Sequence, residues 1–475
     1  MIGREKEQKI LKDAYESPES QFIAVYGRRR IGKTYLVRET FQNDFVFSHT
    51  GIYGGSMKEQ LKAFAASCAD WGFPQKRAPS GWMDAFQLIK EMVLKSDAEK
   101  KVIFLDEMSW MDTAKSGFLT ALEFFWNGWA SARNDVLLVI CASSTSWIVK
   151  KVIHNKGGLH NRLTRRIHLE PFHLRECEML CEAYGFQMTR SEIITGYMIF
   201  GGVPYYWTLM ERGKSLAQNI DSLCFGPNPV MKDEYRFLYA SLFKNPDPYI
   251  RIVETLGKHR KAGMTRKDLV DESGLDNSGA FSGYLEELEQ CGFIREYTEY
   301  GKKKKGSLFQ LIDNFTLFYF KFMKEKGKDP GYWSKNCNSK STDSWKELAF
   351  ERVCLEHLEE MKRALGISGI ITSAHSFQCK ENEAEGVKGS QIDLLIYRSD
   401  QVVNVCEMKY SSEPYAFGRA DGEKLEKEIS DFRIIAKPSH AVHPVLIAAG
   451  GSTKTKYSGM FQAFVSGDDL FREVY

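Results

Sequence analysis

The residues from Gly27 to Thr34 have the types and the spacing that bind a phosphate chain. They form the pattern Gly27-x-x-x-x-Gly32-Lys33-Thr34, between an apolar strand-like run and a helical run. The glycines let the backbone fold its amides around phosphates, and the helix start adds a positive dipole. We expect Lys33 to reach the β- and γ-phosphates and Thr34 to bind Mg²⁺. The predicted nucleotide-binding residues of this loop are Gly27, Arg28, Arg29, Arg30, Ile31, Gly32, Lys33, Thr34 and Tyr35.

A second strand supplies acidic residues for the same chemistry. Residues 102–105 are apolar, as in a parallel strand that is buried on both faces, and Asp106 and Glu107 follow them. Ligands of open α/β sheets bind at the carboxyl ends of the strands. The pattern predicts that Asp106 holds Mg²⁺ and that Glu107 acts as the general base for the attacking water. The alternative is a helix cap after the strand.

A third apolar run, "DVLLVICA", ends at Ser143, and a basic segment with Arg162 follows it. The hydroxyl of Ser143 could sense the γ-phosphate or could simply cap the next turn, and the sequence leaves both readings open. An arginine near a γ-phosphate stabilises the charge of the transition state in cis or in trans. Arg162 is therefore a candidate catalytic residue, with a solvated basic face as its alternative.

Charged residues also stand in an apolar hairpin near the C-terminus, "QIDLLIYRSDQVVNVCEMKY". The alternation predicts two strands joined by a short turn, with Asp393 on the first strand. Glu407 and Lys409 are two residues apart on the second strand, so their side chains share one face. Burying such a pair gains nothing unless the two groups serve as ligand and partner. The spacing favours a metal site over an ordinary strand end.

The composition is that of a globular protein with several domains. The chain has 475 residues, of which 43% are hydrophobic and 27% are charged, a length typical of about three domains. Its net charge of +3 does not identify a partner. The N-terminus lacks the apolar core of a signal peptide, and no apolar run reaches the roughly 20 residues of a membrane helix. The ten scattered cysteines show no disulfide framework, so we expect a cytoplasmic protein without membrane association.

The middle of the chain predicts a DNA-binding type of fold. A helical region over residues 174–231 is followed by a short helix capped by Thr265 and ended by Gly274, and then by another helix. A hairpin with four lysines at 302–305 comes next, which completes the outline of a winged helix. The basic turn could contact a DNA backbone, or the domain could bind protein. Three acids of the second helix would repel phosphates: Glu286, Glu287 and Glu289.

The first half of the chain resembles the archaeal-type ATPase family of P-loop proteins. The resemblance rests on "IGREKE", "GRRRIGKT", "FLDE", "ASSTSWI", "LHNRLTRRIHLEPF" and "GGVPYY". It implies that Arg4 lies near the nucleotide base and that Arg162 is the arginine after the sensor strand. Ala142 stands where this family usually has glycine. The segment "GGVPYY" would belong to a helical lid, although a simple turn between helices explains it equally well.

The C-terminal region resembles the PD-(D/E)xK nuclease superfamily from about Trp345 onward. Asp393, Glu407 and Lys409 match its strand motif, and Glu351, in the amphipathic helix expected over residues 344–365, matches its helix acid. The resemblance implies that the three carboxylates hold Mg²⁺ and that Lys409 supports the attacking water. An inactive, nuclease-like domain that only binds DNA is the alternative.

Together these features predict an α/β protein with four parts. They are a P-loop ATPase core (1–173), a helical lid (174–235), a winged helix (236–312) and a restriction-endonuclease-like domain (313–475). The predicted function is ATP hydrolysis coupled to Mg²⁺-dependent DNA cleavage, in defence against mobile elements. The alternative is a regulatory ATP switch whose C-terminal domains bind DNA or protein without cutting. ATP, Mg²⁺ and DNA are the expected ligands and partners, and a homo-oligomer is left open.

The lysines at 302–305 generate the first prediction. Replacing all four by serine should weaken binding to unrelated duplexes by a similar factor and flatten its salt dependence, because each lysine releases a counterion from a phosphate. A filter-binding titration at several salt concentrations measures this. If the slope against salt is unchanged, the lysines do not contact the DNA backbone.

Overall fold

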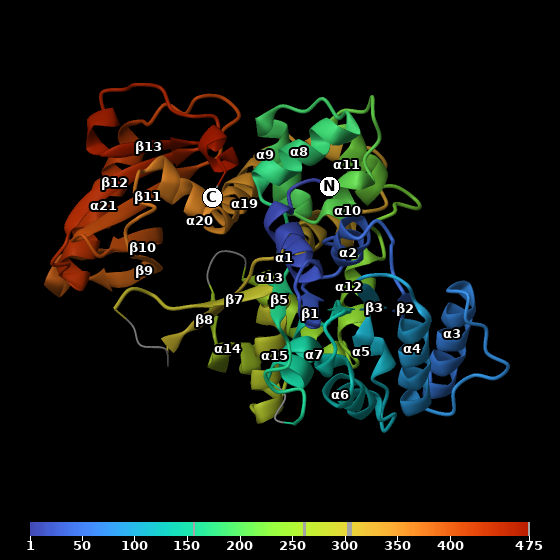
Figure 1. The fold of residues 1–475 in the computed structure, drawn as a ribbon. Coiled ribbons are helices and arrows are strands. Elements are labelled where there is room, and N and C mark those ends of the chain that lie inside the picture. The colour runs from blue at the N-terminus through green and yellow to red at the C-terminus, as the bar shows by residue number, and fades with distance from the viewer. Residues whose placement is uncertain (155–156, 260–262, 302–305, 474–475) are drawn as a thin grey trace. The chain divides into compact units, whose positions relative to one another are not determined.

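The chain forms two compact units in the computed structural model, which describes residues 1–154, 157–259, 263–301 and 306–473. The first unit contains Met1–Pro171 and Leu238–Pro246, and the second contains Phe172–Phe237 and Asp247–Tyr475 (Figure 1). The lysines at 302–305 lie outside the described residues. In the described part of the chain, no helix is both long enough and apolar enough to span a bilayer.

The first unit is built on five parallel strands in the order β2-β3-β4-β1-β5. The central strands carry apolar side chains that are buried on both faces, as a parallel sheet between two helical layers requires. The strands are β1 (Gln21–Tyr26), β2 (Phe47–Thr50), β3 (Lys101–Asp106), β4 (Val136–Ala142) and β5 (Arg165–His168). Because β4 lies between β1 and β3, the residues that follow these three strands meet at one edge of the sheet.

Helices cover both faces of this sheet. Apolar residues of α1 and α2 pack on one face, and those of α3, α4 and α6 pack on the other, giving two separate hydrophobic cores. Ser56 caps α3 in a reciprocal arrangement with Glu59. The helices are α1 (Glu5–Tyr15), α2 (Lys33–Thr40), α3 (Met57–Asp70), α4 (Trp82–Lys95), α5 (Met108–Met111), α6 (Phe118–Gly128) and α7 (Thr145–Ile148).

The second unit begins with short helices that local capping signals delimit. Thr189 and Ser215 cap their helices through side-chain oxygens, and Gly185 ends a helix with a positive φ of 69°. These helices are α8 (Leu174–Tyr184), α9 (Arg190–Phe200), α10 (Pro204–Thr208), α11 (Leu216–Cys224) and α12 (Glu234–Leu242), the last divided between the units.

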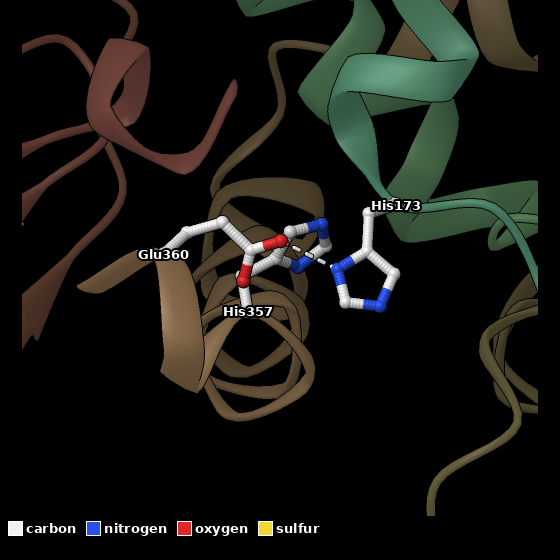
Figure 2. Close-up of side chains that lie close together, drawn as sticks. All are labelled: His173, His357 and Glu360. Carbon is white, nitrogen blue, oxygen red and sulfur yellow. Dashed lines mark hydrogen bonds and ion pairs between the residues drawn. The ribbon is translucent and has the colours of Figure 1, made fainter. Parts of the chain in front are cut away.

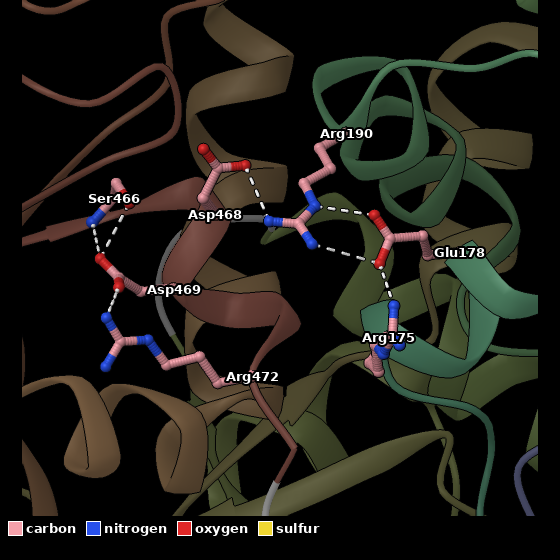
Figure 3. Close-up of polar contacts among 7 residues, drawn as sticks. All are labelled: Arg175, Glu178, Arg190, Ser466, Asp468, Asp469 and Arg472. Carbon is pink, nitrogen blue, oxygen red and sulfur yellow. Dashed lines mark hydrogen bonds and ion pairs between the residues drawn. The ribbon is translucent and has the colours of Figure 1, made fainter.

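A chain of ion pairs joins α8 and α9 to the C-terminal turn of the second unit (Figure 3). Glu178 accepts from Arg175 Nη1 and from Arg190 Nε, each at 2.7 Å. Arg190 also reaches the exposed Asp468 at 3.4 Å. Ion pairs near solvent each contribute little to the free energy of folding. This network nevertheless connects α8 and α9 with the turn that contains Asp468.

A small antiparallel sheet with strand order β6-β8-β7 follows, together with two short helices. Thr265 caps α14 and Gly274 ends it with a φ of 63°, as the sequence indicates. The elements are α13 (Asp247–Lys258), β6 (Met264–Thr265), α14 (Arg266–Ser273), α15 (Gly279–Gln290), β7 (Ile294–Tyr297) and β8 (Leu308–Leu311). An aromatic cluster beyond them connects α16 (Asn314–Phe318), α18 (Tyr332–Asn336) and α19 (Lys340–Glu356).

The C-terminal part of the second unit is a mixed five-stranded sheet in the order β13-β12-β11-β10-β9. The pairs β9–β10 and β10–β11 are antiparallel, whereas β11–β12 and β12–β13 are parallel. The strands are β9 (Thr372–Asn382), β10 (Val387–Arg398), β11 (Val402–Lys409), β12 (Ala441–Ala448) and β13 (Ala463–Ser466). The helix α21 (Arg419–Ala436) packs Leu425 and Phe432 on the face that carries Val403 and Val405.

The structure corrects two local expectations. The polar segment before the predicted hairpin, for which the sequence indicates no strand, contains the strand β9 (Thr372–Asn382), which exposes most of its side chains and is held by backbone pairing with β10. The helix expected over residues 344–365 is broken at His357, so that α19 ends at Glu356 and α20 (Leu358–Ala364) follows. The His357 ring there bonds to backbone groups of two segments, which a helical pattern does not reveal.

Candidate functional site

The phosphate loop lies at the carboxyl end of β1 and is shaped by two glycines. Gly27 has a φ of 142°, and a Cβ there would stand 2.2 Å from the carbonyl oxygen of Leu169. Gly32 has a φ of 91° and is the N-cap of α2. Side chains would be strained at both positions, so glycine is needed for the backbone to turn. The loop leads directly into the positive end of a helix, as phosphate binding requires.

Lys33 is buried and points back over this loop. Its Nζ donates to the carbonyl oxygens of Gly27 at 2.9 Å and Arg28 at 2.8 Å. An ammonium group in this place lies beside the loop whose backbone amides would hold a phosphate chain. Of the other predicted loop residues, Ile31 is buried, whereas Tyr35 is 57% exposed. Arg29 and Arg30 are half-buried, and Arg30 has a φ of 70°.

Asp106 and Thr34 form the candidate magnesium position. The Thr34 hydroxyl donates to Oδ2 of Asp106 at 2.8 Å, which joins the start of α2 to the end of β3. Asp106 is only 3% exposed. Burial, reinforced by the charge of Glu107, raises the pKa of Asp106 to about 6. A carboxylate and a hydroxyl are oxygen ligands of the kind that Mg²⁺ prefers, and a cation would stabilise the ionised acid. These residues therefore fit the ion.

Glu107 is held by Ser143 across the sheet edge. The backbone N–H of Ser143 donates to Oε2 of Glu107 at 3.0 Å, and the Ser143 hydroxyl donates to Oε1. Glu107 itself has a φ of 50°, a strained value for a residue with a side chain. This contact occupies both carboxylate oxygens of Glu107, so the acid must leave Ser143 before it can accept a proton from water. The structure thus gives Ser143 a partner that the sequence did not indicate.

The two predicted arginines outside the loop occupy different surroundings. Arg4 is buried, and its Nη2 donates to the carbonyl oxygen of Glu170 at 2.7 Å, just after β5. Arg162 is exposed in the segment before β5. The structure therefore places Arg4 beside the first unit's sheet edge, while Arg162 faces solvent.

In the second unit, Glu407 and Lys409 lie together at the end of β11. Lys409 Nζ is 2.9 Å from Glu407 Oε1 and 3.7 Å from Asp421 Oδ1. Burial alone would lower the pKa of Lys409, but Glu407 and Asp421 raise it above its ordinary value, so the amine stays charged. Lys424 of α21 also reaches Glu407 Oε1, at 3.0 Å. The carboxylate thus has two ammonium partners.

Glu351 and Asp393 line a separate small cavity. Asp393 precedes Leu394, which pairs with Cys406 next to Glu407, so the strand register brings Asp393 and Glu407 to adjoining positions. The amide of Gln391 donates to Oδ1 of Asp393 at 2.7 Å. Glu351, on α19, shares the cavity wall with Asp393. Glu407 is not among the residues that line it.

Sequence reasoning missed two acids that belong to this region. Glu347 lies one turn before Glu351; it accepts from the Tyr410 backbone N–H at 3.1 Å, and burial raises its pKa. Burial, followed by the charge of Glu407, raises the pKa of Glu428 to about 7. The i, i+4 spacing of Glu347 and Glu351 was the available signal for the first. Nothing local marked Glu428, which α21 brings over the sheet.

Among the described residues, the only three-donor group with ligand atoms all within 4.8 Å is His173, His357 and Glu360 (Figure 2). Glu351, Asp393 and Glu407 do not come that close, so they would have to converge on an ion. In the histidine group, His357 Nε2 accepts from the Leu174 N–H at 2.9 Å and Nδ1 faces the Val353 carbonyl at 2.8 Å. Both ring nitrogens are used by the backbone, which argues against a metal ligand.

Comparison with known proteins agrees with the first site. Residues 1–209 match the family described as "ATPase domain predominantly from Archaea". An uncharacterised protein of Methanocaldococcus jannaschii is 26% identical over 380 residues, covering 76% of this chain and 78% of that protein. The resemblance to archaeal-type ATPases is thereby confirmed for the N-terminal part.

Several solved structures are similar to this chain. The Walker-type ATPase of Pyrococcus abyssi covers 68% of this chain and 96% of its own, with a TM-score of 0.51 and 13% identity. The ORC2 protein of Aeropyrum pernix, in ADPNP–ADP complexes, covers 75% and 96%, with a TM-score of 0.42 and 13% identity. The first likeness shows a shared fold and confirms the predicted α/β P-loop unit.

The Glu107–Ser143 contact adds a third possible role for Ser143, the restraint of Glu107. Glu107→Gln should bind ATP but lose hydrolysis by about 10²-fold or more, because it keeps the shape and loses the base. Ser143→Ala should raise basal hydrolysis a few-fold, because one donor that restrains the carboxylate is gone.

Lys33→Ala should lose nucleotide binding, because the ammonium group that would bind the phosphates is gone. Phosphate release and nucleotide titrations measure these effects.

Ser144→Ala is the matched control, since its hydroxyl contacts Ser146 instead of Glu107. If Ser143→Ala abolishes hydrolysis as Glu107→Gln does, Ser143 senses the γ-phosphate and does not restrain the base.

His357 generates a pH prediction. Burial, with the charge of His173, lowers the pKa of His357 to about 4, so the folded chain holds the neutral ring. An unfolded histidine titrates near pH 6.5, so this stabilisation is complete above pH 6.5 and is lost as the pH falls toward 4. The loss should reach on the order of 1–3 kcal/mol. Glu360 and His173 face the ring.

Thermal melts between pH 7.5 and 5 test this. His357→Gln should lower Tm at pH 7.5, and its difference from the wild type should shrink toward pH 5. The partly exposed His443→Gln is the control. A constant difference at every pH would show that the ring acts by packing alone.

Proposed function

We propose that the chain couples ATP hydrolysis to Mg²⁺-dependent cleavage of DNA by its C-terminal domain. The match of residues 1–209 to the archaeal ATPase domain family supports the first half of this proposal. Defence against mobile elements is the setting we propose for this activity. The observation that supports the second half of the proposal is that Glu351 and Asp393 share a cavity next to the strand end where Lys409 pairs with Glu407. The four-part domain division expected from the sequence is part of the same proposal.

In the ATPase unit, each residue has a distinct task. The loop amides and Lys33 bind the phosphates. Arg4 lies near the position of the nucleotide's adenine base. Thr34 and Asp106 would hold Mg²⁺, which neutralises the developing phosphate charge when bound. Glu107, released from Ser143, takes the proton of the attacking water. Arg162, which is exposed, could complete a site in cis or in a second copy of the chain.

In the C-terminal domain, the topology supports the nuclease reading. A helix, α19, precedes three antiparallel strands, and α21 then leads to β12, parallel to β11. This places Asp393 and Glu407 at adjoining positions of two strands and Glu351 on the neighbouring helix. The carboxylates would hold a divalent ion, which activates water toward a phosphodiester when bound. Lys409 holds its proton and positions that water.

The alternative is a regulatory ATPase that binds DNA or protein without cutting it. One observation favours this reading: Glu407 is neutralised by Lys409 and Lys424, and its carboxylate is apart from the cavity that Glu351 and Asp393 line. The acids Glu286 and Glu289 on α15 also disfavour its entry into a DNA groove. In this reading the charges of β11 serve only to hold α21 in place.

Cleavage assays of two variants separate these functions. Asp393→Ala should abolish cleavage of plasmid or single-stranded DNA while leaving Tm unchanged or raised, because it relieves repulsion between acids. Lys409→Ala should still bind Mn²⁺ but cleave about 10²-fold more slowly or less. The assay uses full-length protein with Mg²⁺ or Mn²⁺, with and without ATP.

Asp400→Ala, in the hairpin turn and paired with Arg398, is the control. A wild type that cuts no DNA offered, together with an Asp393→Ala variant that is only destabilised, would exclude the nuclease and leave the regulatory ATPase.

A further inference from the structure

The cavity beside Glu351 and Asp393 contains two arginines as well as acids. Its volume is about 40 Å³, compared with the roughly 10–15 Å³ that one water needs. This is room for a phosphate-sized group but not for a nucleobase. Arg352 and Glu351 come from α19, Asp393 from β10, and Arg295 and Gln310 from the β7–β8 hairpin.

Two donors of the buried Arg352 guanidinium have no acceptor in the described part of the chain, although the charges of Glu356 and Glu351 lie near it. The residue is 5% exposed, and its Nε and Nη2 are buried and find no hydrogen-bond acceptor among the residues that the structure describes. Burial lowers the pKa of Arg352 to about 10. A buried charged donor without an acceptor costs several kcal/mol. The planar guanidinium binds oxyanions through paired N–H groups, so a phosphate is the ligand that would satisfy it best.

Arg295 is the second cation, and the hairpin holds it in place. Its Nε and Nη2 donate to Oε1 of Gln310 at 2.9 and 2.6 Å across β7 and β8. The hairpin is itself attached to the C-terminal sheet, because the Tyr300 N–H donates to the Ser376 carbonyl at 2.8 Å. The Tyr300 ring also packs 5.5 Å from that of Phe432 on α21. Arg295 thus enters the cavity from outside the C-terminal sheet.

The charges around the cavity suit a metal together with a phosphodiester. Arg295 and Arg352 face the carboxylates of Glu299, Glu351 and Asp393, which leaves one negative charge in excess. One divalent cation at the acids would reverse this to one positive charge. A phosphodiester carries a single negative charge and would neutralise it.

We propose that Arg352 and Arg295 form a phosphate-binding subsite that positions a phosphodiester of nucleic acid against the ion held by Glu351 and Asp393. The β7–β8 hairpin therefore completes the site instead of serving only as a DNA-contacting wing. This inference rests on the proposed nuclease function for the ion, but the subsite itself binds without cleavage. Both arginines are positioning residues.

Calorimetric titration of the full-length protein tests the subsite, with saturating Mg²⁺–ADP so that the ATPase site is filled. The probes are a thymidine dinucleotide, its neutral methylphosphonate analogue and inorganic phosphate. Wild type should bind the dinucleotide at least about 10-fold more tightly than the analogue. Arg352→Gln and Arg295→Gln should each bind the dinucleotide about 10-fold more weakly. Arg352→Lys should recover only part of this affinity, because lysine lacks the paired N–H groups of a guanidinium. Arg419→Gln, whose side chain is 81% exposed, is the control.

The outcomes separate a binding role from a structural one. Because two donors of the buried guanidinium have no acceptor among the described residues, Arg352→Gln should leave Tm unchanged or raised. Should that variant fail to fold, Arg295→Gln carries the test. Equal affinities of wild type and both glutamine variants, or of the dinucleotide and its analogue, overturn the proposal. Tighter binding of inorganic phosphate than of the dinucleotide would assign the subsite to free phosphate and overturn it as well.

The same measurements distinguish this inference from the nuclease proposal. If the dinucleotide binds through Arg352 but the protein never cuts DNA, the subsite stands and the nuclease function falls. If DNA is cut and both arginine variants bind and cut like the wild type, the nuclease function stands and the subsite falls.

Discussion

The cost of burying a charged side chain constrains the two candidate sites of this protein, the phosphate loop region of the first unit and the acidic region at the end of β11 in the second. In the first unit, the sheet edge collects Lys33, Asp106 and Glu107 in an apolar setting. Each group has a specific partner there: loop carbonyls for the lysine, Thr34 for Asp106 and Ser143 for Glu107. These partners lie in the loop after β1, at the start of α2 and just after β4, and the strand order brings them together. Lys33 and Asp106 are buried in this arrangement.

The same constraint gives the second unit its organisation. Glu407 is neutralised by Lys409 on its own strand and by Lys424 on α21, which ties the helix to the end of the sheet. The network of Glu178 and Arg190 joins α8, α9 and the C-terminal turn in a similar way. Arg352 departs from this rule, because two of its buried donors find no acceptor in the described part of the chain. The proposed phosphate subsite rests on this departure.

Local features of the sequence were predictable because they depend on neighbouring residues. Thr265 and Gly274 delimit α14 as expected, since capping is decided within one turn. The strand β9 was missed because its polar, exposed residues have no alternating apolar pattern, and only pairing with β10 makes it a strand. The break at His357 was missed for a similar reason, because its ring binds the backbone at Leu174, far away in the chain.

The sequence by itself determined the phosphate loop, from Gly27 to Thr34, and the acids of β3, because their chemistry follows from backbone geometry over a few residues. It also brought Glu407 and Lys409 to one strand face through the two-residue period of a strand. The tertiary structure alone decided that Ser143 holds Glu107, that Glu428 lies over Glu407, and that Arg295 and Arg352 share a cavity with Asp393. These contacts join segments distant in sequence, and packing, not local periodicity, determines which of them meet.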